Sequence, residues 1–123
     1  MTEMKRVLIV DDSVTTRAYY RSVLEGAGFG VDEAVNGLEG LERAMGAVFD
    51  LAIVDVNMPK MDGYTMIDSL RRDPELATLP ILTISTEPPS PASETRGSDY
   101  HIYKPAAPDD LATMARLLTG AAL

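Results

Sequence analysis

The sequence predicts an α/β fold in which helices cover both faces of a doubly wound, five-stranded parallel sheet. Short apolar runs alternate along the chain with segments in which apolar residues recur at helical spacing. Runs such as VLIV and LAIV do not alternate with polar residues, which indicates strands that are covered on both faces. Parallel strands need long crossover connections, usually helical, so both observations favour the same architecture.

Five strands and four helices follow from this pattern. Strands are expected at residues 7–10, 30–35, 51–54, 81–84 and 100–103. Apolar residues at helical spacing occupy residues 16–27, 38–48, 66–70 and 111–118, which predicts a helix over each segment. Met45, Met66 and Met114 fall on these apolar positions and are expected to fill the core.

Turn and cap residues mark the ends of these helices. They are Gly26 and Gly28 after the first helix, Asn36-Gly37 before the second, Asp62-Gly63 before the third and Pro108-Asp109 before the last. Between the fourth and fifth strands the chain reads STEPPSPASETRGSD, where three closely spaced prolines remove amide donors and clash with helical carbonyls. A fourth helix is therefore expected to be shortened or irregular, starting only after Pro91.

Composition narrows the class of protein. The chain of 123 residues, with 46% hydrophobic and 24% charged residues, is expected to form a single domain over residues 1–123. Its net charge of −8 at pH 7 argues against nonspecific binding to nucleic acid or an anionic membrane, since both would repel it. The lack of cysteine excludes disulfides and thiol chemistry. Because VLIV is too short for a signal peptide or membrane span, a cytoplasmic protein is expected.

Polar residues suited to chemistry follow four of the predicted strands. Asp11 and Asp12 come after the first strand, Asp55 after the third, Ser85 after the fourth and Lys104 after the fifth. Open α/β sheets bind ligands at the carboxyl ends of their strands, where the strand order reverses. If the first and third strands are neighbours, about 4.8 Å apart, the three carboxylates meet in one crevice.

A cluster of three carboxylates predicts a bound cation, because neighbouring negative charges raise one another's pKa unless a positive charge lies among them. Mg²⁺ suits such a site, since it takes hard oxygen ligands and usually binds one or two carboxylates together with phosphate oxygens. Asp55 is then a candidate nucleophile that forms an aspartyl phosphate. Lys104 would offer a compact positive charge to the phosphoryl oxygens, and Ser85 a hydroxyl.

Four motifs, in this order, resemble the receiver domain of two-component response regulators. They are VDDS, DVNMPKMDG, a strand that ends in Ser-Thr, and YKP, and the likeness runs over essentially the whole chain. The opening VDDSVTTR is similar to that of stand-alone, chemotaxis-type (CheY-like) regulators. The resemblance implies the flavodoxin-like strand order 2-1-3-4-5, which is known for the chemotaxis member of this family.

The resemblance also implies roles for the acidic residues. Asp55 would accept a phosphoryl group from a histidine of a partner kinase or phosphotransfer protein. Asp12 and Asp55 would bind Mg²⁺ directly, the backbone carbonyl of Asn57 would add a further ligand, and Asp11 would act mainly through water.

Further residues take roles by the same resemblance. Lys104 would pair with the phosphoryl oxygens, and its bond to Pro105 would be cis, holding the lysine inward. Ser85 would move to bind the phosphoryl group and so couple the chemistry to the protein surface. His101, three residues before Lys104, matches the position of the family's switch residue.

The expected output is a protein contact. No DNA-binding or enzymatic output domain is expected within residues 1–123, and the chain would catalyse only its own phosphorylation and dephosphorylation. The resemblance points to a flagellar switch component, a phosphorelay partner or a phosphate sink, with chemotaxis favoured. A monomer is expected rather than an oligomer, without nucleic acid or membrane as a partner.

Other interpretations of these residues remain open. Asp11 and Asp12 could serve merely to cap the first helix, although Ser13 could do that alone. Ser85 could be merely a small strand-end residue, and His101 could be structural. An aspartate-nucleophile phosphohydrolase would show a DxD pattern with a cap insertion, and a flavodoxin-type electron carrier would need a phosphate-cradling loop where this chain has two anions. A receiver-fold interaction module that signals without phosphorylation is the remaining alternative.

Overall fold

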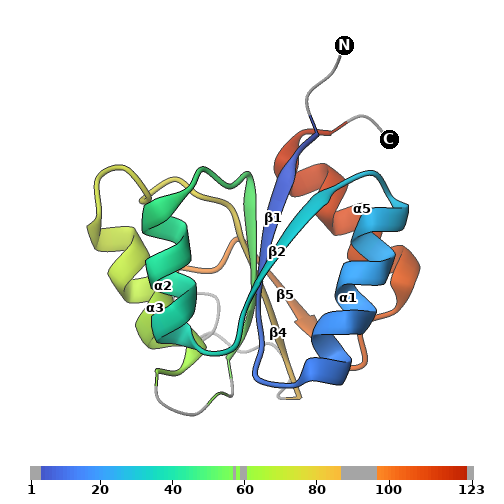
Figure 1. The fold of residues 1–123 in the computed structure, drawn as a ribbon, viewed down its shortest axis with the longest axis horizontal. Coiled ribbons are helices and arrows are strands. Elements are labelled where there is room, and N and C mark those ends of the chain that lie inside the picture. Colours follow the sequence, from blue (N-terminus) through green and yellow to red (C-terminus); the bar gives the residue numbers. More distant parts are fainter. Residues whose placement is uncertain (1–3, 57, 59–60, 87–96, 122–123) are drawn as a thin grey trace.

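The computed structural model describes residues 4–56, 58, 61–86 and 97–121 (Figure 1). In chain order its elements are β1 (Arg6–Val10), α1 (Val14–Gly26), β2 (Gly30–Ala34), α2 (Gly37–Gly46), β3 (Leu51–Asp55), α3 (Gly63–Arg72), β4 (Ile81–Ser85), β5 (Tyr100–Tyr103) and α5 (Pro108–Thr119). Strands and helices alternate along the described residues, except that β5 follows β4 with no described helix between them. None of the helices in the described part of the chain has the length and apolar character that a bilayer span requires.

The five strands form one parallel sheet in the order β2-β1-β3-β4-β5, so the predicted fold class and strand order are confirmed. The register aligns Val10 of β1 with Ala34 of β2 on one side and with Val54 of β3 on the other. Because the pairing is parallel, the carboxyl ends of all five strands lie at one edge of the sheet. Every residue of β3 and β4 is buried, so a reaction that needs access from solvent can take place only at the edge where these strands end.

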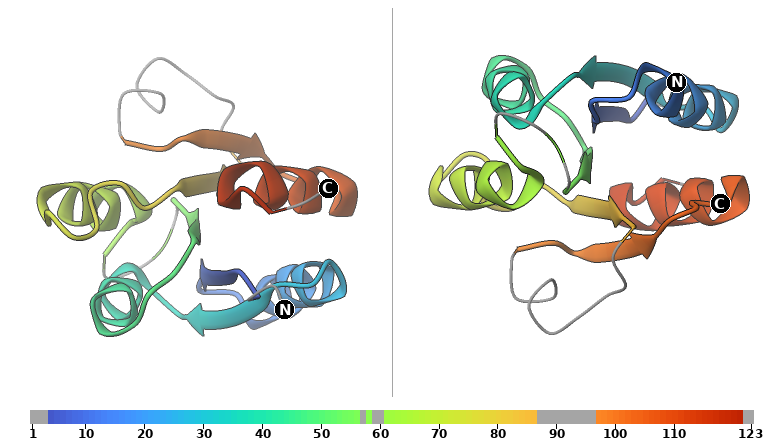
Figure 2. Two further views of the ribbon diagram at one scale, coloured as in Figure 1. Left: turned by 90° about the horizontal axis from the view of Figure 1, so that it is seen from above. Right: turned by 90° about the horizontal axis from the view of Figure 1, so that it is seen from below.

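Helices cover the two faces of the sheet in pairs (Figure 1; Figure 2). On one face, α1 and α5 pack on side chains that include Val7 and Ile9. On the other, α2 and α3 pack on side chains that include Leu8 and Val10. Successive residues of β1 thus point into different cores, as the two-residue period of a strand requires. Each such side chain contributes about 1.5–3 kcal/mol when fully buried, and this apolar burial fixes the sheet on which the site is built.

The predicted helix starts are confirmed at their cap residues. The side chains of Ser13, Asn36 and Asp62 each accept a hydrogen bond from the backbone amide three residues later, at the starts of α1, α2 and α3. Pro108 opens α5, where its missing amide costs nothing. Gly28 follows the end of α1 with φ 94°, a left-handed conformation that favours glycine.

Several predicted details differ from the structure. β3 extends to Asp55 itself, and β2 stops one residue short of Val35. Met45 is 65% exposed, so its expected place in the core is wrong, although Met66 is fully buried as expected. The reason is that α2 faces the core with the small residues Gly37, Gly40 and Ala44, and the bulky side chains on its other side stay in solvent. The expected irregular fourth helix falls largely on residues 87–96, which lie outside the described residues.

Gly63 lets the start of α3 pass directly against the end of β3. A Cβ atom at this position would lie 2.6 Å from the carbonyl oxygen of Asp55 and 2.7 Å from the Cα of Val56. Both neighbours are backbone atoms, which have little room to move. The first turn of α3 therefore packs directly against the main chain of Asp55, with no space between the two backbones for a side chain.

We expect Gly63→Ala to lower the free energy of unfolding by about 1–3 kcal/mol, because the added methyl forces backbone apart in a filled core. Gly46→Ala is the matched control, since a Cβ there meets no atom within 4 Å. The control should be neutral or stabilising by up to about 1 kcal/mol. Urea unfolding of both variants measures the difference, and equal stabilities would contradict the close packing at Gly63.

Candidate functional site

Three carboxylates meet at the carboxyl edge of the sheet. Asp11 and Asp12 directly follow β1, and Asp55 is the last residue of the neighbouring strand β3. One potential ligand oxygen from each residue can be chosen so that all three lie within 4.8 Å of one another. The convergence predicted from the strand ends is therefore present, with Asp11 and Asp55 buried and Asp12 exposed.

Only one of the two carboxylate oxygens of Asp11 has a hydrogen-bond partner among the described residues. Its Oδ1 accepts a hydrogen bond of 2.8 Å from the backbone amide of Ser13. Its Oδ2 is buried and has no hydrogen-bond partner among the described residues. Burial raises the pKa of the Asp11 carboxyl above its ordinary value, and the Asp12 carboxylate acts in the same direction, while the Ser13 amide and the Lys104 ammonium oppose the shift. Among the described residues, the Asp11 carboxyl therefore lacks a full set of hydrogen-bond partners.

Lys104 directly follows β5, the strand beside β4, and brings a positive charge to the same edge of the sheet. Its Nζ lies 3.8 Å from Oδ2 of Asp55, within ion-pair range, and its side chain is 27% exposed. Its backbone amide donates a hydrogen bond of 2.7 Å to the carbonyl of Ser85, which joins the end of β4 to the residue after β5. The peptide bond from Lys104 to Pro105 is cis, as the family resemblance implied.

Ser85 and His101 lie on the adjacent strands β4 and β5. Ser85 ends β4 and is fully buried, one residue past Ile84, which pairs with Asp55. His101 of β5 is half-buried, and its Nδ1 lies 2.7 Å from the hydroxyl of the buried Thr83. Thr83 and Ser85 are two residues apart on one strand, so they face the same side of the sheet. Asn57, expected to supply a carbonyl ligand, lies outside the described residues.

Sequence reasoning missed two polar residues that contact this region. Thr83, the partner of His101, could not be found without the register of β4 and β5. Arg17 donates a hydrogen bond of 2.7 Å from Nη1 to the backbone carbonyl of Asp11. For Arg17 the sequence shows only a positive charge near the amino terminus of a helix, which opposes the helix dipole but does not identify the contact.

The donor set fits a hard divalent cation. Three carboxylates supply only oxygen ligands, and two of them are buried, where an uncompensated negative charge is costly. The unpartnered Oδ2 of Asp11 is the specific observation that indicates a missing positive partner. Oxygen ligands at a partly open site suit Mg²⁺ better than a thiophilic metal. The site is therefore suited to a metal ion of this kind.

Comparison with known proteins agrees with this geometry. The model of the response regulator receiver domain family matches residues 7–116. The structure of the Vibrio cholerae chemotaxis protein CheY4 superimposes with a TM-score of 0.87 at 34% identity, covering 94% of this chain and 99% of that one. The response regulator TrrA of Thermotoga maritima, solved in complex with Mg²⁺ and BeF, has a TM-score of 0.84 at 26% identity, covering 94% and 99%.

Curated relatives extend the comparison to longer proteins. The sensor histidine kinase CheAY of Helicobacter pylori is 36% identical over 115 residues, 89% of this chain and 14% of that protein. The gliding motility regulatory protein of Myxococcus xanthus is 36% identical over 94 residues, 76% of this chain and 12% of that protein. The chain thus spans only a small part of the length of these two relatives. By its family match, its sheet order and its acidic edge, this chain belongs to the response regulator receiver domains.

Proposed function

We propose that this domain accepts a phosphoryl group on Asp55 from a phosphohistidine of a histidine kinase or phosphotransfer protein, in a Mg²⁺-dependent reaction. The observation that carries the proposal is the position of Asp55. Its carboxylate ends a buried strand, belongs to the cluster with Asp11 and Asp12, and lies 3.8 Å from the Lys104 ammonium. A nucleophile on a rigid strand end, with charge on both sides, is suited to phosphoryl transfer.

The transfer itself needs few groups. A carboxylate oxygen of Asp55 attacks the phosphorus, the new O–P bond forms as the P–N bond of the donor breaks, and the donor imidazole leaves with the electron pair of that bond. Lys104 lies beside the attacking carboxylate, where its ammonium can hold a phosphoryl oxygen. Because β3 is buried throughout, the attacking oxygen starts from a fixed position.

Asp11, Asp12 and Asp55 would hold the Mg²⁺, and the carbonyl of Asn57 would join them as the family resemblance implies. The ion would offset the negative charge of the carboxylates and of the incoming phosphoryl group. The chain's own contribution is the placement of the ligands. Asp55 comes from β3, and Asp11 and Asp12 come from the turn after β1, so the sheet sets their separation.

Ser85 and His101 are proposed to carry the signal away from the site. Ser85 would bind a phosphoryl oxygen with its hydroxyl. Thr83, two residues earlier on β4, contacts the His101 ring, so a shift of the β4 end would be transmitted to β5. The output is proposed to be a contact with another protein. The similarity to a chemotaxis protein favours a role in chemotaxis, and a phosphate sink is the other role that we propose.

We expect the protein to gain one phosphoryl group, roughly 80 Da, when it is incubated with Mg²⁺ and acetyl phosphate. Asp55→Asn should abolish the gain, because the amide is a poor nucleophile. Asp62→Asn is the control, since it removes a nearby carboxylate and still leaves an oxygen to cap α3. Intact mass spectrometry at short times checks the result. No adduct on the parent protein, when hydrolysis is excluded, would instead favour an interaction module that signals without phosphorylation.

We expect Mg²⁺ at about tenfold its Kd to stabilise the protein by about 1.4 kcal/mol, which raises Tm by roughly 5 °C. Asp11→Asn should remove this rise. In EDTA the same variant should be more stable than the parent, on the order of 1 kcal/mol, because it removes a buried charge and keeps the oxygen that accepts from Ser13.

The pH dependence provides a second check on Asp11. Burial raises the folded pKa of this carboxyl above its unfolded value. The metal-free parent should therefore lose stability as the pH rises from the unfolded pKa through the folded pKa, and the Asn variant should lack that loss. Glu42→Gln, which removes an exposed charge on α2, serves as the control for both measurements. A full Mg²⁺ response in Asp11→Asn would exclude Asp11 from the metal site.

A further inference from the structure

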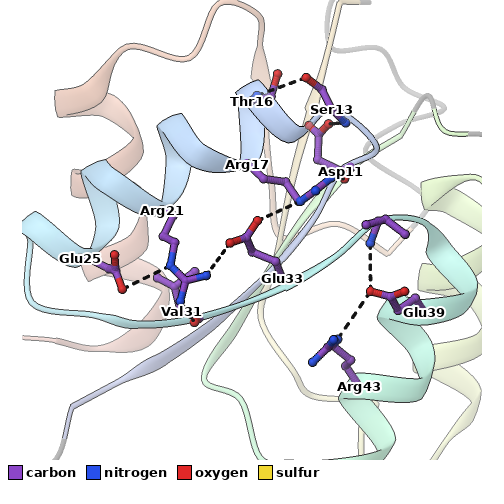
Figure 3. Close-up of polar contacts among 11 residues, drawn as sticks. Asp11, Ser13, Thr16, Arg17, Arg21, Glu25, Val31, Glu33, Glu39 and Arg43 are labelled. Atoms are coloured by element: carbon purple, nitrogen blue, oxygen red, sulfur yellow. Dashed lines mark hydrogen bonds and ion pairs between the residues drawn. The ribbon is translucent and has the colours of Figure 1, made fainter.

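We propose that Arg17 is a positioning residue for the acidic site, held by Glu33 of β2, and that it sets the affinity for Mg²⁺ by fixing the main chain of Asp11. This inference rests on the proposed function. Figure 3 shows Arg17 reaching from α1 toward both Asp11 and Glu33. Its Nη1 donates to the Asp11 carbonyl at 2.7 Å, and its Nε donates to a Glu33 carboxylate oxygen at 2.9 Å.

Arg17 is unusually buried for a charged residue on a surface helix. Its side chain is only 11% exposed, whereas Arg21, one turn later on α1, is 41% exposed. Removing a guanidinium from water is costly unless hydrogen bonds replace the lost hydration. Arg17 has such bonds to two separate elements, so its position is determined by tertiary contacts and not by its own helix.

The helix itself disfavours this arrangement. α1 begins at Val14, and its first turn contains no acidic residue to balance the arginine. A positive charge so close to the amino terminus of a helix opposes the helix dipole. The tertiary contacts of Arg17 outweigh this local cost, and one of them is with the main chain of a proposed metal ligand.

The bond from Arg17 completes the restraint on Asp11. The Asp11 amide donates to the carbonyl of Ala34 at 3.1 Å, its carbonyl accepts from Arg17, and its Oδ1 accepts from the amide of Ser13. Both ends of the residue and one carboxylate oxygen are therefore fixed. The buried Oδ2 is the atom left without a partner among the described residues, and so it is the atom available to a cation or to a water bound to one.

Glu33 links this restraint to the edge strand of the sheet. Its carboxylate bonds Arg17 through one oxygen and Arg21 through the other, and Arg21 also pairs with Glu25 at 3.4 Å (Figure 3). Hydrogen bonds from Arg21 and Arg17 lower the pKa of Glu33, which keeps the carboxylate charged. Of the two arginines, only Arg17 also bonds to Asp11, so the two can be separated by substitution.

The test compares Arg17→Met with Arg21→Met by titrating each protein with Mg²⁺ alone in a calorimeter, at a temperature at which all variants are folded. Arg17→Met should weaken Mg²⁺ binding by about tenfold or more, as is usual when a group that orients a metal ligand is lost. Arg21→Met, which shares Glu33 but does not bond Asp11, should stay within about twofold of the parent. Arg17→Lys should recover part of the affinity, because an ammonium can make one of the two bonds.

Phosphorylation by acetyl phosphate supplies a second readout. Saturating Mg²⁺ should largely restore the rate in Arg17→Met, because the variant keeps Asp55 and Lys104. If Arg17→Met does not fold, Glu33→Gln replaces it and should weaken Mg²⁺ binding by about threefold or more.

Two outcomes would overturn the inference in different ways. An Arg17→Met variant that loses thermal stability but keeps the parent's Mg²⁺ affinity would show a purely structural role, and the proposed function would stand. A parent protein that neither binds Mg²⁺ nor becomes phosphorylated would overturn the proposed function together with the inference.

Discussion

Asp11, Asp12 and Asp55 each place one carboxylate oxygen within 4.8 Å of the other two, so their charges repel and the rest of the structure must offset that repulsion. It does so through the sheet. β3 is buried along its whole length, so the main chain of Asp55 cannot move away from the other two carboxylates. The turn after β1 is held by hydrogen bonds to Asp11 from the amide of Ser13 and the guanidinium of Arg17. Apolar packing on both faces of the sheet makes the charged edge possible, because it fixes the carboxylates in positions that their mutual repulsion would otherwise disfavour.

Most of the fold could be predicted because its signals are local. The strand starts at residues 30, 51, 81 and 100 follow from apolar runs, and the cap residues Ser13, Asn36 and Asp62 act within one turn. The exposure of Met45 could not be predicted in this way. Apolar spacing identifies a helix, but whether a given face is covered depends on which small residues let the helix approach the sheet, and in α2 these are Gly37, Gly40 and Ala44.

The acidic cluster was predictable for a similar reason, since Asp11, Asp12 and Asp55 stand at strand ends and parallel strands align their ends. The supporting contacts were not. Arg17 meets Glu33 only because β2 lies beside β1, and His101 meets Thr83 only in the observed register of β5 on β4. Such pairs join residues 16 and 18 positions apart, a separation that no helical or strand period connects.

Lys104 divides its contacts between its main chain and its side chain. The amide anchors the segment after β5 to the carbonyl of Ser85, whereas the ammonium alone reaches Asp55. The anchor is independent of the identity of the side chain. A descendant of this domain could therefore exchange the lysine and lose the proposed phosphoryl transfer, yet still keep its sheet intact. Such an exchange would be a short evolutionary route from the proposed phosphorylated switch to a constitutive binding scaffold.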